Sequence, residues 1–204
     1  HRYWQSLPED SRPEFWLFGL SLGALHSDLS ADLYDVIAAP YTGAFRAGPP
    51  FAGQSWQHLT ADRAPESPAW RPLYGDGRVV RFINQTSGST PPPAAPDWGP
   101  VRILYLQYPS DGITFFSPSL LWRRPDWLSG PAPHDVSPNL RWLPLVTFFQ
   151  VGFDLLTATT TPAGYGHVYA ARDYLYGWQS LLDDPPLSTE AMARLNALFR
   201  ARNL

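Results

Sequence analysis

The most restrictive feature of the sequence is a serine between two glycines, placed where an apolar run gives way to a helical pattern. The run, residues 14–19, is short, rich in aromatic side chains and preceded by proline, which predicts a buried strand. Residues 25–38 follow with apolar side chains at helical spacing. Those on one helical face are Leu29, Leu33, Val36 and Ile37. A strand that turns directly into a helix predicts an α/β fold.

Later segments extend this alternation of strands and helices. Residues 101–108 satisfy the same criteria for a buried strand, and residues 78–83 alternate more weakly, which predicts a third strand or a sheet edge. Residues 143–156 are apolar almost all round and predict a buried helix, although residues 146–151 fit a strand equally well. The sequence shows no internal repeat and no sign of a second domain.

Two further segments have local signatures. Residues 187–203 predict a C-terminal helix, with Ser188 as its N-cap and Glu190 in its first turn. The apolar stripe of this helix consists of Met192, Leu195, Leu198 and Phe199. Residues 86–98 are rich in proline, serine and glycine, and predict an exposed loop.

The composition excludes several kinds of chemistry. All 15 basic residues are arginine and there is no cysteine, so the chain has neither thiolate nor amine nucleophiles, and no Cys-ligated zinc. Hydroxyl, carboxyl and imidazole groups remain, and their chemistry calls for no cofactor and no metal. A net charge of −3 without a basic stripe argues against nucleic acid as a partner. The uncharged stretch 142–153 is too short to span a bilayer, which takes roughly 20 residues.

Gly19-Leu20-Ser21-Leu22-Gly23 has the form G-x-S-x-G, in the strand–turn–helix context in which that motif presents a nucleophilic serine. Glycines on either side let the main chain reverse sharply, so the Ser21 hydroxyl is expected at the carboxyl end of the sheet. The backbone N–H of Leu22 then lies at a helix N-terminus, where it can stabilise an oxyanion. The alternative is a glycine-rich turn with an idle serine.

A serine nucleophile needs a base, and the base needs an orienting carboxylate. Asp111 follows the strand 101–108 and is therefore expected at the same sheet edge as Ser21, unlike the aspartates at 126, 135 and 154. The alternative role for Asp111 is to cap a turn. Among the histidines at 1, 26, 58, 134 and 167, only His167, between Gly166 and Val168, completes the order Ser, Asp, His.

With these residues in place, the chain resembles a bacterial family of membrane-associated α/β-hydrolases over its length up to about residue 178. The resemblance is carried by eight ordered motifs: Gly19-Leu20-Ser21-Leu22-Gly23-Ala24, Ala47-Gly48-Pro49-Pro50-Phe51, Tyr105-Leu106-Gln107-Tyr108-Pro109-Ser110-Asp111, Phe116-Ser117-Pro118, Pro125-Asp126-Trp127-Leu128, Asp135-Val136-Ser137, Val146-Thr147-Phe148-Phe149-Gln150-Val151 and Gly164-Tyr165-Gly166-His167.

The resemblance implies an α/β-hydrolase fold, a mostly parallel sheet with flanking helices, in which Ser21 is the nucleophile, Asp111 the acid and His167 the base. Members usually carry hydrophobic spans ahead of the catalytic domain, which implies association with a bacterial cell membrane. They often have a glutamate where Leu20 stands. Their domain begins upstream of His1, with further strands and a glycine-rich loop. We therefore expect residues 1–204 to be the C-terminal portion of the catalytic domain, whose sheet an upstream segment completes.

Aromatic and aliphatic side chains follow the predicted acid, and they predict an apolar or lipid-like ester as substrate. The predicted pocket residues are Leu20, Ile113, Phe115, Phe116 and Trp122. The alternative is that these side chains cover the sheet. Three functions fit the sequence: a serine esterase or lipase-like hydrolase, an acyltransferase that uses the same acyl-enzyme, and a non-catalytic binding protein with this fold.

Overall fold

A parallel sheet forms the centre of the computed structural model, which describes residues 2–30, 37–86, 96–183, 185 and 187–202. Its strands are β1 (Trp16–Leu20), β2 (Gly43–Ala47), β3 (Val80–Ile83) and β4 (Arg102–Leu106). They lie side by side in the order β1-β2-β4-β3, and every neighbouring pair is parallel. The predicted α/β class is confirmed, and so are the three predicted strands, of which β3 is a sheet edge.

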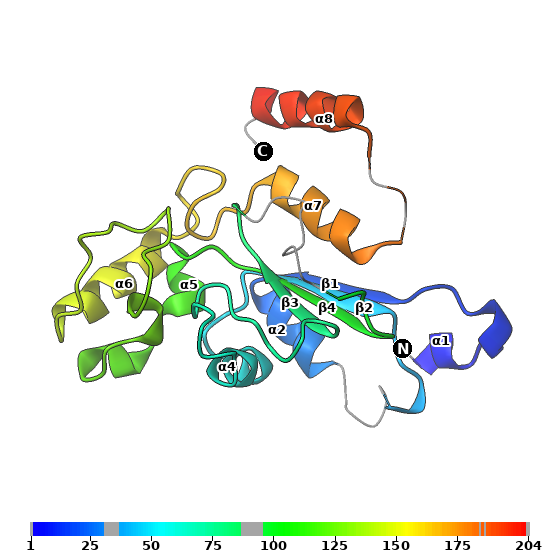
Figure 1. Cartoon of the computed structure of the whole chain (residues 1–204), viewed down its shortest axis with the longest axis horizontal. Helices are drawn as coiled ribbons and strands as arrows, with labels where there is room; N and C mark the ends of the chain where they lie inside the picture. Colours follow the sequence, from blue (N-terminus) through cyan, green and yellow to red (C-terminus); the bar gives the residue numbers. More distant parts are fainter. Residues whose placement is uncertain (1, 31–36, 87–95, 184, 186, 203–204) are drawn as a thin grey trace.

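Helices cover both faces of the sheet (Figure 1). α7 (Ala171–Leu181) and α8 (Thr189–Ala201) lie over one face, and α2 (Leu22–Leu29) and α4 (Gln54–Ala61) lie under the other. The remaining elements are α1 (Arg2–Gln5), η1 (Glu9–Ser11), α5 (Gly112–Phe115), η2 (Pro118–Leu121), η3 (Asp126–Leu128) and α6 (Val146–Thr157). α5, η2, η3 and α6 gather beyond the carboxyl ends of the strands.

Two apolar clusters hold these layers together. On the α7 side, Phe45 of β2 packs edge-on against Trp178, with 5.3 Å between ring centroids. Gly177 makes this approach possible, because a Cβ there would lie 2.3 Å from the Phe45 ring. On the α4 side, Trp56 packs with Phe82 and Tyr105. Alternation along each strand therefore supplies a core to both faces.

β2 is the strand that the sequence pattern does not reveal, because its five residues include only one large apolar side chain and a charged one, Arg46. All five residues are nevertheless buried. The Arg46 guanidinium pairs with Asp28 at 2.8 Å and donates to the Tyr105 hydroxyl at 2.7 Å and to the Ser27 hydroxyl at 3.0 Å. These partners compensate the cost of burying the charge, and they fasten α2 to the sheet.

The predicted helix 25–38 is corrected in its bounds and in its buried face. α2 begins at Leu22, directly after Ser21, and ends at Leu29, while residues 31–36 lie outside the described residues. Leu29 and Ile37, two members of the predicted apolar face, are 67% and 70% exposed. Small residues, Ala24 and Ser27, are the buried ones, because the helix lies too close to β1 for larger side chains.

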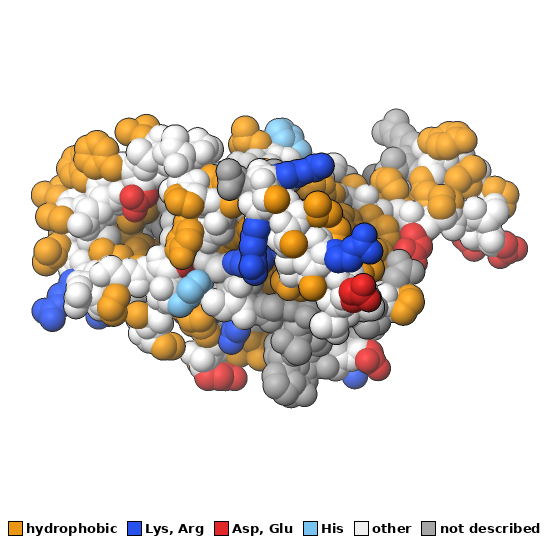
Figure 2. All heavy atoms as spheres, turned by 90° about the horizontal axis from the view of Figure 1, so that it is seen from above, with side chains coloured by type: hydrophobic (Ala, Val, Ile, Leu, Met, Phe, Trp, Pro, Cys, Tyr) orange, Lys and Arg blue, Asp and Glu red, His pale blue; other side chains and the backbone are white. Residues whose placement is uncertain are grey.

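The predicted helix 143–156 is confirmed as a helix, α6, but the prediction that it is buried is wrong. Phe149, Phe153 and Leu156 are 55%, 64% and 78% exposed, and Figure 2 shows hydrophobic side chains gathered at this end of the molecule. Only Thr147 and Val151 of the helix are buried. Within the described residues α6 packs mainly against α5 and η2, and its exposed side chains form an apolar surface.

The C-terminal helix is confirmed as α8, and the Ser188 hydroxyl accepts a hydrogen bond from the Ala191 N–H at 3.2 Å, as expected of an N-cap. In its predicted apolar stripe, Leu198 is exposed, whereas the other three residues are half-buried. Most of the predicted proline-rich loop 86–98 lies outside the described residues. Among the helices of the described segments, none is long and apolar enough to cross a membrane.

Candidate active site

Ser21 occupies a strained turn between β1 and α2. Its φ of 56° and ψ of −118° lie outside the conformations that an L-residue ordinarily adopts. The turn depends on Gly19, where a Cβ would lie 2.2 Å from the carbonyl carbon and oxygen of Gly23. At Gly23 itself a Cβ would meet nothing within 4 Å. The first glycine of the motif is therefore required by packing, and the second is not.

Asp111 and His167 form a buried pair. Asp111 is fully buried at the N-cap of α5, and its Oδ2 lies 2.7 Å from His167 Nδ1. The same oxygen accepts from the Tyr169 hydroxyl at 2.7 Å and from the Thr114 hydroxyl at 3.1 Å, while Oδ1 accepts from the Ile113 N–H at 2.9 Å. These donors hold the carboxylate in one orientation. Asp111 thus caps the start of α5 and also contacts an imidazole.

The other ring nitrogen, His167 Nε2, is buried and has no hydrogen-bond partner within the described residues. Ser21 and this ring both contact the short backbone stretch formed by Ala47 and Gly48. The Ser21 N–H donates to the carbonyl of Ala47 at 2.9 Å, and a Cβ on the next residue, Gly48, would lie 2.6 Å from His167 Cε1. Ser21 and His167 therefore flank the same short stretch of backbone at the end of β2, although no hydrogen bond joins them in this structure.

Two tyrosines that sequence reasoning missed support the pair. The Tyr169 hydroxyl accepts from the Tyr108 N–H at 3.4 Å and donates to Asp111. The rings of Tyr108 and Tyr169 stack at 4.2 Å between centroids. Burial, reinforced by the Asp111 carboxylate, raises the pKa of Tyr169 well above its usual range, so the hydroxyl stays a donor. The local signal for this role is weak, because Tyr169 lies 58 residues from Asp111 in sequence.

Tyr108 is held in turn by Asp173 of α7. Its hydroxyl donates to the Asp173 carboxylate and accepts from the Ala170 N–H at 2.9 Å. Burial raises the pKa of Tyr108, and the neighbouring carboxylate raises it further. Burial likewise raises the pKa of Asp173, although its hydrogen bond from Tyr108 counteracts part of that effect. The chain after His167 is thereby fixed to the strand end that bears Asp111.

Backbone N–H groups near Ser21 are the candidates for binding an oxyanion. Leu22 is the first residue of α2, where its N–H lies at the positive end of the helix dipole. Two other backbone N–H groups at this sheet edge are already used, because Gly48 donates to the carbonyl of Leu106 at 2.8 Å and Phe51 to that of Ile113 at 2.9 Å. Neither is the second donor, and the glycine-rich loop expected for that role has no counterpart among the described residues.

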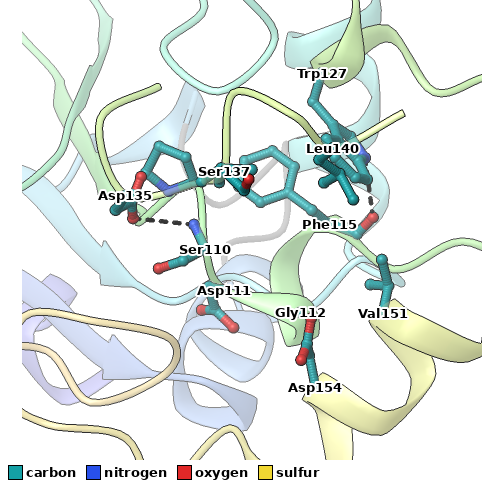
Figure 3. A pocket seen from close by; sticks show the side chains of 12 residues that line it. Ser110, Asp111, Gly112, Phe115, Trp127, Asp135, Ser137, Leu140, Val151 and Asp154 are labelled. Atoms are coloured by element: carbon teal, nitrogen blue, oxygen red, sulfur yellow. Dashed lines mark hydrogen bonds between the residues drawn. The ribbon is translucent and has the colours of Figure 1, made fainter. Parts of the chain in front are cut away.

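A hollow of about 210 Å³ lies beside the Asp111 turn, between Phe115, Trp127 and Val151 (Figure 3). Of the five residues predicted to line a substrate pocket, Phe115 lines this hollow, and Leu20, Ile113, Phe116 and Trp122 do not. Leu20 and Trp122 are 42% and 67% exposed, and Ile113 and Phe116 are half-buried. Phe115 also packs against Trp56 in the core, so the alternative that such residues cover the sheet holds for it.

An aromatic row leads from the end of β2 to the surface. Phe51 contacts Phe116 with 5.2 Å between ring centroids, Phe116 contacts Phe148 at 5.3 Å, and Phe148 contacts Phe149 at 5.4 Å. Phe51 lies three residues after Gly48, and Phe149 is exposed on α6. The row therefore connects the surroundings of His167 with the apolar side of α6.

The other histidines and aspartates are arranged differently. His26 contacts the carbonyl of Leu22 on α2, and His58 pairs with Asp62 on the exposed side of α4. His134 Nδ1 lies 3.8 Å from the buried carboxylate of Asp135. Within the described residues, no group of three or more histidine, aspartate or glutamate side chains could hold a metal ion.

The chain was compared with protein families, curated proteins and solved structures. A family model described as "Alpha/beta-hydrolase family" matches residues 1–195. A search of curated proteins and a search of solved structures find no match. The family match covers nearly the whole chain and agrees with the parallel sheet and its flanking helices. The chain therefore belongs to the alpha/beta-hydrolase family.

Proposed function

We propose that this chain is a serine hydrolase that cleaves a carboxylic ester through an acyl-serine intermediate. The observation that carries the proposal is the buried His167–Asp111 hydrogen bond, which leaves Nε2 without a partner beside the Ser21 turn. A histidine with one nitrogen bound to a carboxylate and the other directed to a serine is the arrangement that activates a hydroxyl. Membership in the alpha/beta-hydrolase family supports a hydrolase-type activity.

The two half-reactions follow from these roles. His167 Nε2 takes the proton of Ser21 Oγ as that oxygen bonds to the ester carbonyl carbon. The adduct collapses, its bond to the alcohol oxygen breaks, and His167 returns the proton to the leaving alcohol. Water then donates a proton to His167 and bonds to the acyl carbon, and Ser21 leaves with the proton. Asp111 fixes the tautomer and stabilises the imidazolium in both halves.

Substrate binding brings Ser21 and His167 together in this proposal. The two must come within about 2.6–3.2 Å for proton transfer, and such contacts commonly tighten only when substrate is bound. The N–H of Leu22 supports the oxyanion. The backbone of Ser21 is held on both sides, because its N–H donates to the Ala47 carbonyl and its own carbonyl accepts from the Leu25 N–H. His167 is held by its bond to Asp111.

An apolar acyl group is the substrate class that the surroundings favour. The row Phe51–Phe116–Phe148–Phe149 offers aromatic surface from the end of β2 outward, without a charged side chain among its members. Each ring can bury methylene groups, and each buried CH₂ contributes about 0.8 kcal/mol. Of the predicted pocket residues, Phe116 lies in this row.

Two expectations raised by the family resemblance remain predictions. One is association with a bacterial cell membrane. The other is completion of the sheet by a preceding segment of the same protein. β1 is an edge strand of the described sheet, and an edge strand can pair with a further strand.

A fluorophosphonate probe tests the nucleophile. We expect the wild-type protein and Ser30→Ala, a control serine at the end of the same helix, to be labelled, and Ser21→Ala to remain unlabelled. Equal labelling of Ser21→Ala would refute the assignment of Ser21.

His167→Ala should lose esterase activity, and full retention of that activity would refute the assignment of His167 as the base. Product analysis with added alcohols separates hydrolase from acyltransferase, and a wild-type protein that is not labelled would favour a binding protein.

A further inference from the structure

Ser110 links the two loops that carry Asp111 and His167. Its hydroxyl accepts a hydrogen bond from the Gly166 N–H at 3.0 Å, and its own N–H donates to Asp135 Oδ2 at 3.1 Å. Ser110 directly precedes the acid, and Gly166 directly precedes the histidine. One residue thus connects the end of β4 with a turn 56 residues later in the chain.

Asp135 is the anchor of this link. Its side chain is fully buried, with Oδ2 accepting from the Ser110 N–H and from Gln85 Nε2 at 2.7 Å. Gln85 Nε2 also lies 3.4 Å from the carbonyl of Gly164, in the histidine turn. A buried carboxylate destabilises a fold unless its partners compensate. Asp135 Oδ1 has no hydrogen-bond partner within the described residues, and His134 Nδ1 lies 3.8 Å from it. The two donors to Oδ2 lead to the site, because Ser110 precedes Asp111 and Gln85 contacts the carbonyl of Gly164.

The histidine turn, residues 164–167, contains two glycines at positive φ. Gly164 and Gly166 have φ of 94° and 56°, conformations that glycine adopts easily but does not prefer over others. Bonds to nearby residues hold much of the turn: the Gly164 N–H donates to the carbonyl of Val168 at 2.8 Å, the Val168 N–H to that of Tyr165 at 3.1 Å, and the His167 N–H to that of Ala158 at 3.0 Å. Local bonds shape the turn, whereas the long-range bonds of Gly166 to the Ser110 hydroxyl and of Gly164 to Gln85 Nε2 tie it to the loop that carries Asp111.

We propose that Asp135 and Ser110 are positioning residues, which set the distance and orientation of His167 relative to Asp111 and Ser21. Figure 3 shows Ser110 lying between the two carboxylates, with that of Asp111 directed away from Asp135. Asp135 therefore acts through the backbone of Ser110 and does not contact the imidazole. The inference rests on the proposed function, because it assigns these residues a part in the same reaction.

Substitutions of Ser110 give the sharpest test. Ser110→Ala removes the acceptor for Gly166, and we expect kcat to fall by about 10- to 100-fold, since a displacement of about 1 Å costs about 100-fold. KM should stay within about two-fold, because no substrate contact is lost. Ser110→Thr keeps the hydroxyl and should keep kcat. Ser137→Ala, a serine that lines the same hollow, should match the wild type.

Substitutions of Asp135 test the anchor. Asp135→Asn retains an oxygen acceptor for the Ser110 N–H and should keep most of the activity, whereas Asp135→Ala should resemble Ser110→Ala. Because both residues act through one link, the double variant Ser110→Ala/Asp135→Ala should be no slower than the slower single variant. Multiplied losses in the double variant would show that Asp135 acts by another route. If Asp135→Ala fails to fold, the comparison of Ser110→Ala with Ser110→Thr decides the matter.

Two readouts separate this inference from the proposed function. The fluorophosphonate labelling rate reports the assembled site, and the proton resonance of His167 Nδ1–H reports its bond to Asp111 without any turnover. A wild-type protein that the probe does not label would overturn the proposed function. The inference about Ser110 and Asp135 would still be supported if Ser110→Ala loses this resonance and Ser110→Thr keeps it. A Ser110→Ala protein with wild-type labelling and a wild-type resonance would overturn the inference and leave the proposed function standing.

Discussion

Gly48→Ala is the substitution that tests most directly whether the turn after β2 positions His167. The residue has a φ of 53°, and an added Cβ would lie 2.6 Å from His167 Cε1 and 2.9 Å from the Tyr169 ring. Carbon atoms pack at about 3.5 Å or more, so the imidazole must retreat by roughly 0.9 Å. It cannot do so without disturbing its 2.7 Å bond to Asp111.

The expected effect has two separable parts. Alanine at a positive φ costs roughly 1–2 kcal/mol of folding free energy, which lowers the thermal midpoint of a domain of this size by roughly 2–8 °C. The displaced ring lowers kcat in addition, by about 100-fold. Gly75→Ala is the matched control, because Gly75 has a φ of 56° but a Cβ there would meet nothing within 4 Å.

The assay compares ester hydrolysis and thermal unfolding in the wild type and the two variants. Both variants should lose stability, Gly48→Ala the more because of its clash with the buried rings, and only Gly48→Ala should lose activity. If Gly48→Ala and Gly75→Ala hydrolyse a short soluble ester equally fast, the His167 ring is not held against Gly48 during turnover, and the geometric argument fails. If both lose activity in proportion to stability, backbone strain and not displacement of the ring is responsible.

Two other predictions concern the fold. Gly19→Ala should prevent β1 from packing beneath α2, because the added Cβ clashes with the backbone of Gly23. Gly23→Ala should be neutral or stabilise the helix by up to about 1 kcal/mol. Thermal unfolding checks both variants, and similar midpoints would contradict the packing argument. Burial raises the pKa of Tyr105 from 10.0 to about 12. The unfolded chain therefore releases this proton first, and stability should fall as the pH rises from 10 to 12, by roughly 3 kcal/mol for this group. Urea unfolding below pH 10 and at pH 12 measures the fall, which should be shallower in Tyr105→Phe; an unchanged slope would exclude Tyr105 as a cause.

Much of the site could be predicted from the sequence because its signals are local. The G-x-S-x-G turn, the strand before it and the helix after it are contiguous, and Asp111 follows its strand within a few residues. The N-cap of α8 at Ser188 is equally local. Parallel strands bring their carboxyl ends to one edge, so a residue that follows a strand can be assigned to the site by topology alone.

Only the tertiary structure decided which side chains meet across long separations. β2 escaped prediction because Arg46 is acceptable in a buried strand only when Asp28, Ser27 and Tyr105 surround it. α6 has the composition of a buried helix, yet one side of it has no neighbour within the described residues.

The same reason explains the part of the site that local patterns missed. Asp135 was set aside as the acid because it follows no strand, and the structure instead places it one hydrogen bond from the residue before the acid. Tyr169 likewise reaches Asp111 only through the folded chain. The sequence alone therefore determined which groups are available for the chemistry and in what order they occur. Their positions depend on hydrogen bonds between residues more than 20 positions apart, such as Ser110 and Asp135, and no local pattern encodes such a contact.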